Sequence, residues 1–295
     1  MDKSGNKRIS RYSRSDAPAG MAMQDRDRQI MKAVHEYRFL TRSQIQRLFG
    51  MNCVTRVNVR LRKLFDHGYL DRRFRPTITG TSETIYVLGK RGIPIVDQMT
   101  GLQEKEIISV RRLALAAKEH SLEHDLSVND FRISVVNEIE VEGSLKLVRW
   151  LDARSCEQRF EVRDGGKVTK STLRPDGFFQ LTHESKLYSF FVEIDLATSS
   201  QEQLQAKFQT YLDFQNLGLY ERAFGLKTFY VLVVTNSPER RDSLKETADR
   251  LSSDIFWFST SPDMGTKWLT DAIWRRSRFS EIRALFLLTG GGKQS

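Results

Sequence analysis

The stretch RPDGFFQLTHESKLYSFFVEIDLATSS, residues 174–200, contains two apolar runs joined by a polar turn. The runs FFQL and LYSFFV have the length and composition of buried strands, and the turn around residues 182–186 predicts a hairpin. Three carboxylates stand near the strand ends: Asp176 before the first run, and Glu193 and Asp195 at the end of the second. Their placement is the main indication of the chemistry of this chain.

These carboxylates are expected to converge. Side chains alternate between the two faces of a strand, so Glu193 and Asp195 share a face. In an antiparallel hairpin the start of one strand lies beside the end of the next, which brings Asp176 close to both. Hard oxygen ligands suit Mg²⁺ or Mn²⁺, which support phosphodiester hydrolysis, so we predict a metal site at these three residues. The alternative is a turn aspartate in Pro-Asp-Gly and a solvated strand end.

The surroundings of the hairpin predict an α/β domain over residues 108–285. A helical pattern covers about residues 108–138, CEQRFEV (156–162) alternates like a strand, and DGGKVTKSTL (164–173) reads as a loop. Downstream, the sequence predicts a helix over about 200–215, the apolar strand TFYVLVVT (228–235), a helix over 238–251, a short strand and a terminal helical stretch. Strands in hairpins, then alternating with helices, predict a mixed sheet flanked by helices.

Length and composition set the broad class of the protein. A chain of 295 residues is long for one domain and natural for two. No stretch approaches the roughly 18 uninterrupted apolar residues of a membrane helix, and the N-terminus has no apolar signal region. Cys53 and Cys156 lie far apart and form no CxxC pair, which favours a reducing cytoplasm over a structural zinc site. Residues 1–22 read as a disordered basic tail and residues 286–295 as a flexible tail.

The basic surplus is confined to the first third of the chain. Residues 1–100 carry 20 Lys and Arg against 9 Asp and Glu, whereas residues 101–295 carry 27 against 28. A localised basic surplus on a small domain is typical of a polyanion binder, and nucleic acid is the expected partner. A basic solubility tail would account for the 5 basic residues of the first 20 but not for the other 15.

Residues 23–102 predict a winged helix-turn-helix domain. Helical patterns cover 25–37, 41–49 and 54–67, and two short strands follow around the polar turn TITGTSE. The helix over 54–67 would be the recognition helix, with its basic stripe toward a DNA groove and phosphates. The expected DNA-binding residues are Arg42, Arg56, Arg60, Lys63, Arg72, Arg73 and Arg75. The alternative is a partner-binding or dimerising winged helix with solvated arginines.

The motifs RPDG and VEID together resemble the pattern of PD-(D/E)XK nucleases. More closely, residues 25–250 resemble the replication-relaxation family of plasmid and mobile-element proteins, in the winged helix, LEHDLSVND (122–130), RPDGFF, FFVEIDLATSS, and a helix with Lys207 and Tyr211. The resemblance implies DNA processing in plasmid or conjugative-element replication and mobilisation. Its implied partners are double-stranded DNA and a relaxase or replication protein, with no membrane; the oligomeric state stays open, a homodimer included.

One position departs from the nuclease pattern. A nuclease of this fold usually has lysine two residues after the motif glutamate, and here that position is Asp195. Lys207 on the following helix could reach back over the strand ends and stabilise an oxyanion, in a Mg²⁺-dependent DNA endonuclease. Alternatively, Lys207 neutralises the acidic cluster structurally. Both alternatives stay open, as does that of a non-catalytic transcriptional regulator or relaxosome and replication adaptor.

Other polar residues in this region have competing interpretations. His120 and His124 have the i, i+4 spacing of zinc ligands but no third ligand at suitable spacing, so a buried, hydrogen-bonded histidine is favoured. In nucleases of this fold an acid from the first helix often joins the site, and Glu119, Glu123 and Asp130 are the candidates here. Thr198 and Ser199 precede a helix and are expected as caps rather than nucleophiles.

Overall fold

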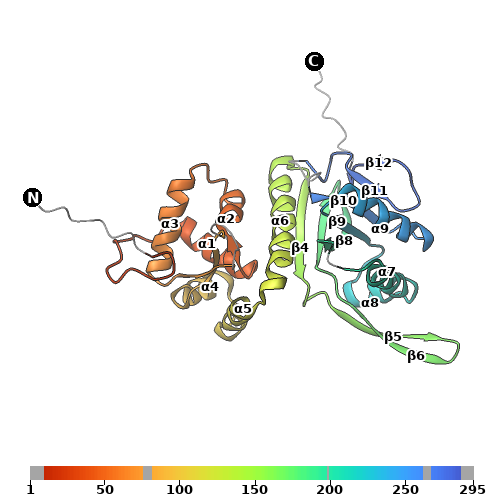
Figure 1. Cartoon of the computed structure of the whole chain (residues 1–295), viewed down its shortest axis with the longest axis horizontal. Coiled ribbons are helices and arrows are strands. Elements are labelled where there is room, and N and C mark those ends of the chain that lie inside the picture. Colours follow the sequence, from red (N-terminus) through yellow and green to blue (C-terminus); the bar gives the residue numbers. More distant parts are fainter. Residues whose placement is uncertain (1–9, 76–81, 198, 262–266, 287–295) are drawn as a thin grey trace, which may run out of the picture. The chain divides into compact units, whose positions relative to one another are not determined.

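The chain folds into two compact units, residues 1–133 and residues 134–295 (Figure 1). The structure is a computed structural model that describes residues 10–75, 82–197, 199–261 and 267–286. The sequence places a domain boundary between residues 102 and 108, whereas the division into units falls inside helix α6, Glu119–Glu142. No helix of the described residues is long and apolar enough to cross a membrane.

The N-terminal unit opens with helices around a small antiparallel sheet. In chain order its first elements are α1 (Asp25–Glu36), β1 (Leu40–Thr41), α2 (Arg42–Leu48), α3 (Val54–Asp66), β2 (Leu70–Arg73) and β3 (Ile85–Leu88). The strands pair antiparallel in the order β1-β3-β2. Residues 76–81, which include most of the predicted wing turn, lie outside the described residues.

Helices α2 and α3 follow from their sequences. Thr41 caps α2 with its side-chain oxygen, which accepts from the backbone N–H of Gln44, as the Thr-x-x-Gln spacing favours. α3 begins after the exposed Cys53 and buries Val57, Leu61, Leu64 and Phe65, the face that its spacing predicts. Together with α1, this face forms the core of the unit.

The second half of the N-terminal unit is also helical. It contains a short 3₁₀ turn at Lys90–Gly92, then α4 (Ile93–Thr100), α5 (Glu104–Ala116) and the start of α6. The expected single helix over 108–138 is therefore wrong: α5 ends where the backbone of Ala117 turns extended, with φ −57° and ψ 130°. Ile107 of α5 and Ile133 of α6 lie in the same core as α1 and α3.

Residues 10–22, part of the predicted basic tail, form no helix or strand and lie against α3. The side chains of Arg60 and Lys63 on α3 donate to the carbonyls of Ala22 and Gly20, and His67, directly after α3, bonds to the carbonyl of Ala19. Arg62 adds bonds to the carbonyls of Ser10 and Ser13. The basic side chains of α3 thus provide hydrogen-bond donors for backbone carbonyls of this segment. Residues 1–9 lie outside the described residues.

The C-terminal unit is built on a mixed sheet with the strand order β12-β11-β10-β9-β8-β7-β4. Its strands are β4 (Leu145–Asp152), β7 (Gly177–His183), β8 (Lys186–Asp195), β9 (Tyr230–Thr235), β10 (Phe256–Thr260), β11 (Trp274–Arg276) and β12 (Ile282–Arg283). β8, β9 and β10 run parallel, and the pairs β4–β7, β7–β8, β10–β11 and β11–β12 are antiparallel. The mixed sheet flanked by helices is confirmed, but the expected terminal helix is wrong, since β11 and β12 occupy its place.

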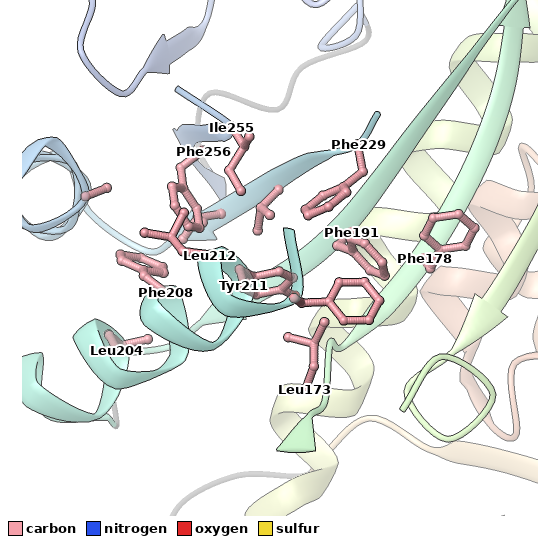
Figure 2. Close-up of a cluster of buried hydrophobic side chains, with 14 of the residues drawn as sticks. Leu173, Phe178, Phe191, Leu204, Phe208, Tyr211, Leu212, Phe229, Ile255 and Phe256 are labelled. Atoms are coloured by element: carbon pink, nitrogen blue, oxygen red, sulfur yellow. The ribbon is translucent and has the colours of Figure 1, made fainter. Parts of the chain in front are cut away.

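One face of this sheet is covered by α7 (Gln201–Asn216), α8 (Leu219–Phe224) and α9 (Pro238–Arg250) (Figure 1). Ser200 caps α7 through a bond from the backbone N–H of Gln203, whereas Ser199 only accepts with its carbonyl and Thr198 lies outside the described residues. Figure 2 shows Phe208 and Tyr211 of α7 directed at Phe191 and Phe256 of the sheet. This aromatic layer fixes the position of α7 over β8.

β5 (Gln158–Asp164) and β6 (Lys167–Leu173) pair with each other outside the main sheet. The predicted loop over 164–173 is therefore wrong, because its residues form the second strand of a hairpin. Gly165 and Gly166 both have positive φ, 51° and 84°, which is the backbone that a two-residue hairpin turn requires. At the other end of the chain, Phe286 is buried, and residues 287–295 of the expected tail lie outside the described residues.

Candidate functional site

Asp176 lies beside Glu193 at the open end of the β7–β8 hairpin. Gly177 pairs with Val192, and the backbone N–H of Asp176 donates to the carbonyl of Val192 at 3.0 Å. The Asp176 carboxylate accepts from the backbone N–H of Ile194 at 2.8 Å. The hairpin register therefore holds this half-buried carboxylate next to the one on β8.

Glu193 is buried, with 4% of its surface exposed, and its two oxygens have different partners. Oε1 accepts from the hydroxyl of Tyr211 at 2.5 Å, and Oε2 pairs with the Lys207 ammonium. Lys207 and Tyr211 lie one turn apart on α7, so both reach the same carboxylate. The Lys207 side chain remains 31% exposed, at the rim of the cluster.

Burial and charge set the protonation of this cluster. Burial, opposed by the charge of Lys207 and helped by that of Asp176, raises the pKa of Glu193 to about 7. Burial lowers the pKa of Lys207, but the negative charges of Glu193 and Asp176 outweigh it, so the lysine stays charged at neutral pH. Burial also raises the pKa of Tyr211 well above its ordinary value, and the phenol is a neutral donor.

Asp195 is held by a different partner. Its Oδ2 accepts from Arg240 Nε of α9 at 2.7 Å, and its Oδ1 accepts from the backbone N–H of Ala197 at 3.2 Å. Arg240 also donates to the carbonyl of Ser199 at 2.7 Å. Strand parity places Asp195 on the face of Glu193, as expected, but Arg240 satisfies its charge there. Asp195 is thus paired with Arg240, and its expected role as a metal ligand stays a prediction.

Asp176 and Glu193 are the two neighbouring carboxylates at this site that bear on the expected metal ion. Among the described residues there is no group of three or more His, Cys, Asp and Glu side chains that could hold a metal ion. Mg²⁺, however, commonly takes one or two carboxylates and completes its shell with water and substrate phosphate, a role that Asp176 and Glu193 could fill. For the zinc alternative, His124 is half-buried near Asp125, and the His120 side chain lies outside what the structure describes.

The acidic residues considered on the first helix belong to the N-terminal unit. Asp130 accepts from Gln44 Nε2 at 2.9 Å and pairs with Arg47 of α2. Glu119 and Glu123 are both exposed on α6. The buried thiol of Cys156 lies near the carboxylate cluster. Burial raises the pKa of Cys156, and the charges of Asp152, Glu193 and Asp176 add to the effect.

Several arginines expected to contact DNA are engaged within the N-terminal unit. Arg60 pairs with Asp27 of α1, whose side chain is 1% exposed, with Nε to Oδ1 at 2.6 Å. Arg73 donates to the carbonyls of Ala114 and Ala117 at the end of α5. The guanidinium of Arg72 stacks on Phe65 and Tyr86, and Arg42 pairs with Glu83. Arg60, Arg72 and Arg73 therefore have partners inside the unit, and their expected contact with DNA stays a prediction.

The exposed face of α3 differs from the stripe that the sequence indicated. Arg56 is exposed, Lys63 bonds to the Gly20 carbonyl at 3.1 Å, and Arg75 is half-buried. Beside Arg56, the exposed positions are Val54, Thr55, Asn58 and Val59, and Val59 has 54% of its surface exposed. The exposure of Thr55, Arg56 and Val59 could be predicted from the sequence, because they occupy the side of the helix opposite the buried stripe.

These features define an α/β protein with a carboxylate–lysine cluster at the end of parallel and antiparallel strands. The family model of replication-relaxation proteins matches residues 31–228, about two thirds of the chain, and the chain belongs to that family. Among solved structures, the restriction endonuclease FokI matches with a TM-score of 0.25 and 11% identity, over 82% of this chain and 44% of that chain. A search of curated proteins found no match.

Proposed function

We propose that this chain is a DNA-binding protein of plasmid or mobile-element replication and mobilisation, with a divergent PD-(D/E)XK nuclease-like C-terminal unit. Family membership supports the process, and the basic surplus of the first 100 residues supports the DNA partner. The observation that carries the nuclease proposal is the contact of Lys207 with Glu193 beside Asp176. Nucleases of this pattern have a lysine two residues after the motif glutamate, where this chain has Asp195. In the proposal, Lys207 supplies that positive charge from α7.

The N-terminal unit is proposed to dock on duplex DNA as a winged helix. The order α1, β1, α2, α3, β2, β3 supports this assignment, with α3 as the recognition helix. Arg56 carries the donors that read base edges in a major groove, and Val59, on the same side of α3, offers an apolar contact for a thymine methyl group. These exposed residues replace Arg60 in the proposed interface.

In the C-terminal unit, Asp176 and Glu193 are proposed to hold Mg²⁺, which would activate water and offset charge on the scissile phosphate. Tyr211 and Lys207 orient the Glu193 carboxylate from α7. A bound cation would stabilise ionised Glu193, whose pKa is otherwise raised to about 7 by burial. Lys207, exposed on one side, would face the negative charge of the phosphate.

The test is nicking of supercoiled plasmid with Mg²⁺ or Mn²⁺. We expect Asp176→Ala to abolish metal-dependent nicking, because it removes one of two ligands, while duplex binding persists. Glu202→Gln, an exposed acid in the first turn of α7, is the matched control and should nick like the wild type. Absence of nicking by the wild type with either metal would overturn the enzyme proposal.

A non-catalytic adaptor is the second candidate, and one observation favours it. Both oxygens of Glu193 and both of Asp195 already have partners, on α7, α9 and the following backbone. Such closed contacts could serve only to fix the helices on the sheet. In that case the wild type would bind DNA without cutting it, and Asp176→Ala would leave every DNA property unchanged.

A further inference from the structure

The β5–β6 hairpin, within the described residues, is a two-stranded ribbon that pairs with no other strand. Its register runs from Gln158 opposite Leu173 to Asp164 opposite Lys167. Figure 1 shows it extending away from the main sheet of its unit. The ribbon is anchored only at its base, where Leu173 is buried in the core and Phe160 lies 5.8 Å from Phe214 of α7, measured between ring centroids.

The outer part of the ribbon contributes nothing to the core. Arg163 and residues 165–170 are exposed, and Val168 has 52% of its surface exposed. An isolated pair of strands is at best marginally stable in water, and the exposed outer part of this ribbon buries little apolar surface against its own unit. Its outer surface is therefore available for a partner.

The ribbon is basic in a unit that is otherwise nearly neutral. Residues 157–174 carry five basic side chains and three acidic ones, a surplus of +2, whereas the rest of the unit, residues 134–156 and 175–295, carries 17 basic and 19 acidic ones. Two of the basic groups, Arg159 and Arg174, lie at the base and share Glu157, at 2.9 and 2.7 Å. The other three, Arg163, Lys167 and Lys170, are exposed toward the tip.

The basic surface continues from the ribbon onto α8. A hollow of 580 Å³ lies between them, and Arg159, Arg163 and Arg222 line it together with Glu161 and apolar side chains. Three arginines against one acid give this hollow a positive potential that suits a phosphate backbone. β6 also leads directly into the candidate site, because only Arg174 and Pro175 separate Leu173 from Asp176.

We propose that the β5–β6 ribbon is a second DNA-binding element, which lies in a groove of duplex DNA and guides the backbone toward Asp176. A two-stranded ribbon has the width that a major groove admits, and its exposed cations would contact the flanking phosphates. The proposal rests on the proposed DNA-binding function, but not on cleavage. It adds a contact from the C-terminal unit, separate from that of α3.

The test is the salt dependence of duplex binding by the full chain, measured by fluorescence anisotropy. The ribbon variant is Arg163→Gln, Lys167→Gln and Lys170→Gln. The control is Lys146→Gln, Lys186→Gln and Lys227→Gln, three exposed lysines elsewhere in the same unit with the same charge change. Each lost phosphate contact lowers the slope of log K against log salt by about 0.9, so the ribbon variant should lose about 2.7 and the control close to none.

The outcomes separate the two proposals. If the wild type binds duplex but the salt slopes of the ribbon variant and the control are equal, the proposal for the ribbon is overturned and α3 remains the proposed DNA contact. A wild type that does not bind duplex at all overturns both proposals. A lower salt slope in the ribbon variant, together with no nicking by the wild type, supports DNA binding by the ribbon and overturns only the proposal of nuclease activity.

Discussion

Glu193 shows how much one buried carboxylate depends on its partners. The Lys207 ammonium and the Tyr211 hydroxyl occupy its two oxygens, and burial still raises its pKa to about 7. Removing either partner leaves a charge in a site where water cannot replace the lost contact. The stability of this cluster is therefore expected to respond to pH and to the charge at position 207.

Lys207→Met tests this expectation. The variant leaves Glu193 without its cation, and we expect the free energy of unfolding to fall by about 2 kcal/mol at neutral pH. This is less than the roughly 3–5 kcal/mol for breaking a fully buried ion pair, because Lys207 is partly exposed. The loss should shrink at pH 5, where Glu193 is protonated and needs no cation. Urea unfolding at both pH values measures it, and Lys207→Arg, which keeps the charge, is the control. An equal loss at both pH values would contradict the assigned role.

Glu138 on α6 offers a second pH test within the C-terminal unit. Its carboxylate accepts from the backbone N–H groups of Leu269 and Thr270, and burial raises its pKa from 4.5 to about 7. Below pH 4.5 the group is protonated in the folded and unfolded states, whereas above pH 7 the folded state bears the cost of the buried charge. Folding stability from this group should thus fall as pH rises, by roughly 3 kcal/mol.

The measurement compares the wild type with Glu138→Gln in urea at a series of pH values. The difference between their free energies of unfolding should change by roughly 3 kcal/mol in favour of the variant as pH rises through this window. A difference that is constant with pH would show that Glu138 keeps an ordinary pKa.

At the scale of elements, α3 combines a buried face, a structural arginine and an exposed face. Arg60 and Arg56 lie one turn apart, yet only Arg60 meets a buried carboxylate, that of Asp27. The same substitution at the two positions should therefore have opposite consequences for folding and for DNA binding.

Arg60→Gln should cost about 3 kcal/mol of unfolding free energy, because it leaves Asp27 buried and unpaired. Arg56→Gln should change stability by no more than about 0.5 kcal/mol and lower the salt slope of duplex binding by about 0.9. Urea unfolding and anisotropy titrations on both variants check this. If Arg56→Gln were the unstable variant, the assignment of the two faces would be reversed.

The sequence predicted those elements whose signals are local. The β7–β8 hairpin, the buried stripe of α3, and helices α7 and α9 all follow from periodicity and caps. The break between α5 and α6 left no Gly or Pro in the sequence, and β6 lacks the apolar alternation of a packed strand because its tip packs on nothing. Both features were therefore missed.

The partners of the charged groups were predictable only in part. The approach of Lys207 to Glu193 spans 14 residues and follows from one strand and the next helix. Arg240 lies 45 residues from Asp195, and Asp27 lies 33 residues from Arg60, so these pairs depend on tertiary packing that no local pattern encodes. That is why the sequence indicates functional roles for Asp195 and Arg60 but not the ion pairs that they form.

At the scale of the whole molecule, charge is distributed unevenly between the two units. The N-terminal third holds the basic surplus, and in the C-terminal unit the β5–β6 ribbon carries exposed cations toward its tip, with Arg222 of α8 lining the adjoining hollow. Membership of the replication-relaxation family gives this distribution a biological setting. A protein with two separate basic surfaces can hold DNA at two points along its length, which increases its effective affinity for long duplexes.

The two cysteines give this chain a practical property. Cys53 is exposed immediately before α3, while Cys156 is buried, with its pKa raised by burial and neighbouring carboxylates. The cysteine thiolate is the group that attacks a thiol reagent, so the exposed Cys53 should be labelled in the folded protein and the buried Cys156 should not. A fluorophore attached there would sit at the entrance of the proposed recognition helix. The natural sequence thus carries its own position for observing the docking of α3 on DNA, with no engineered residue.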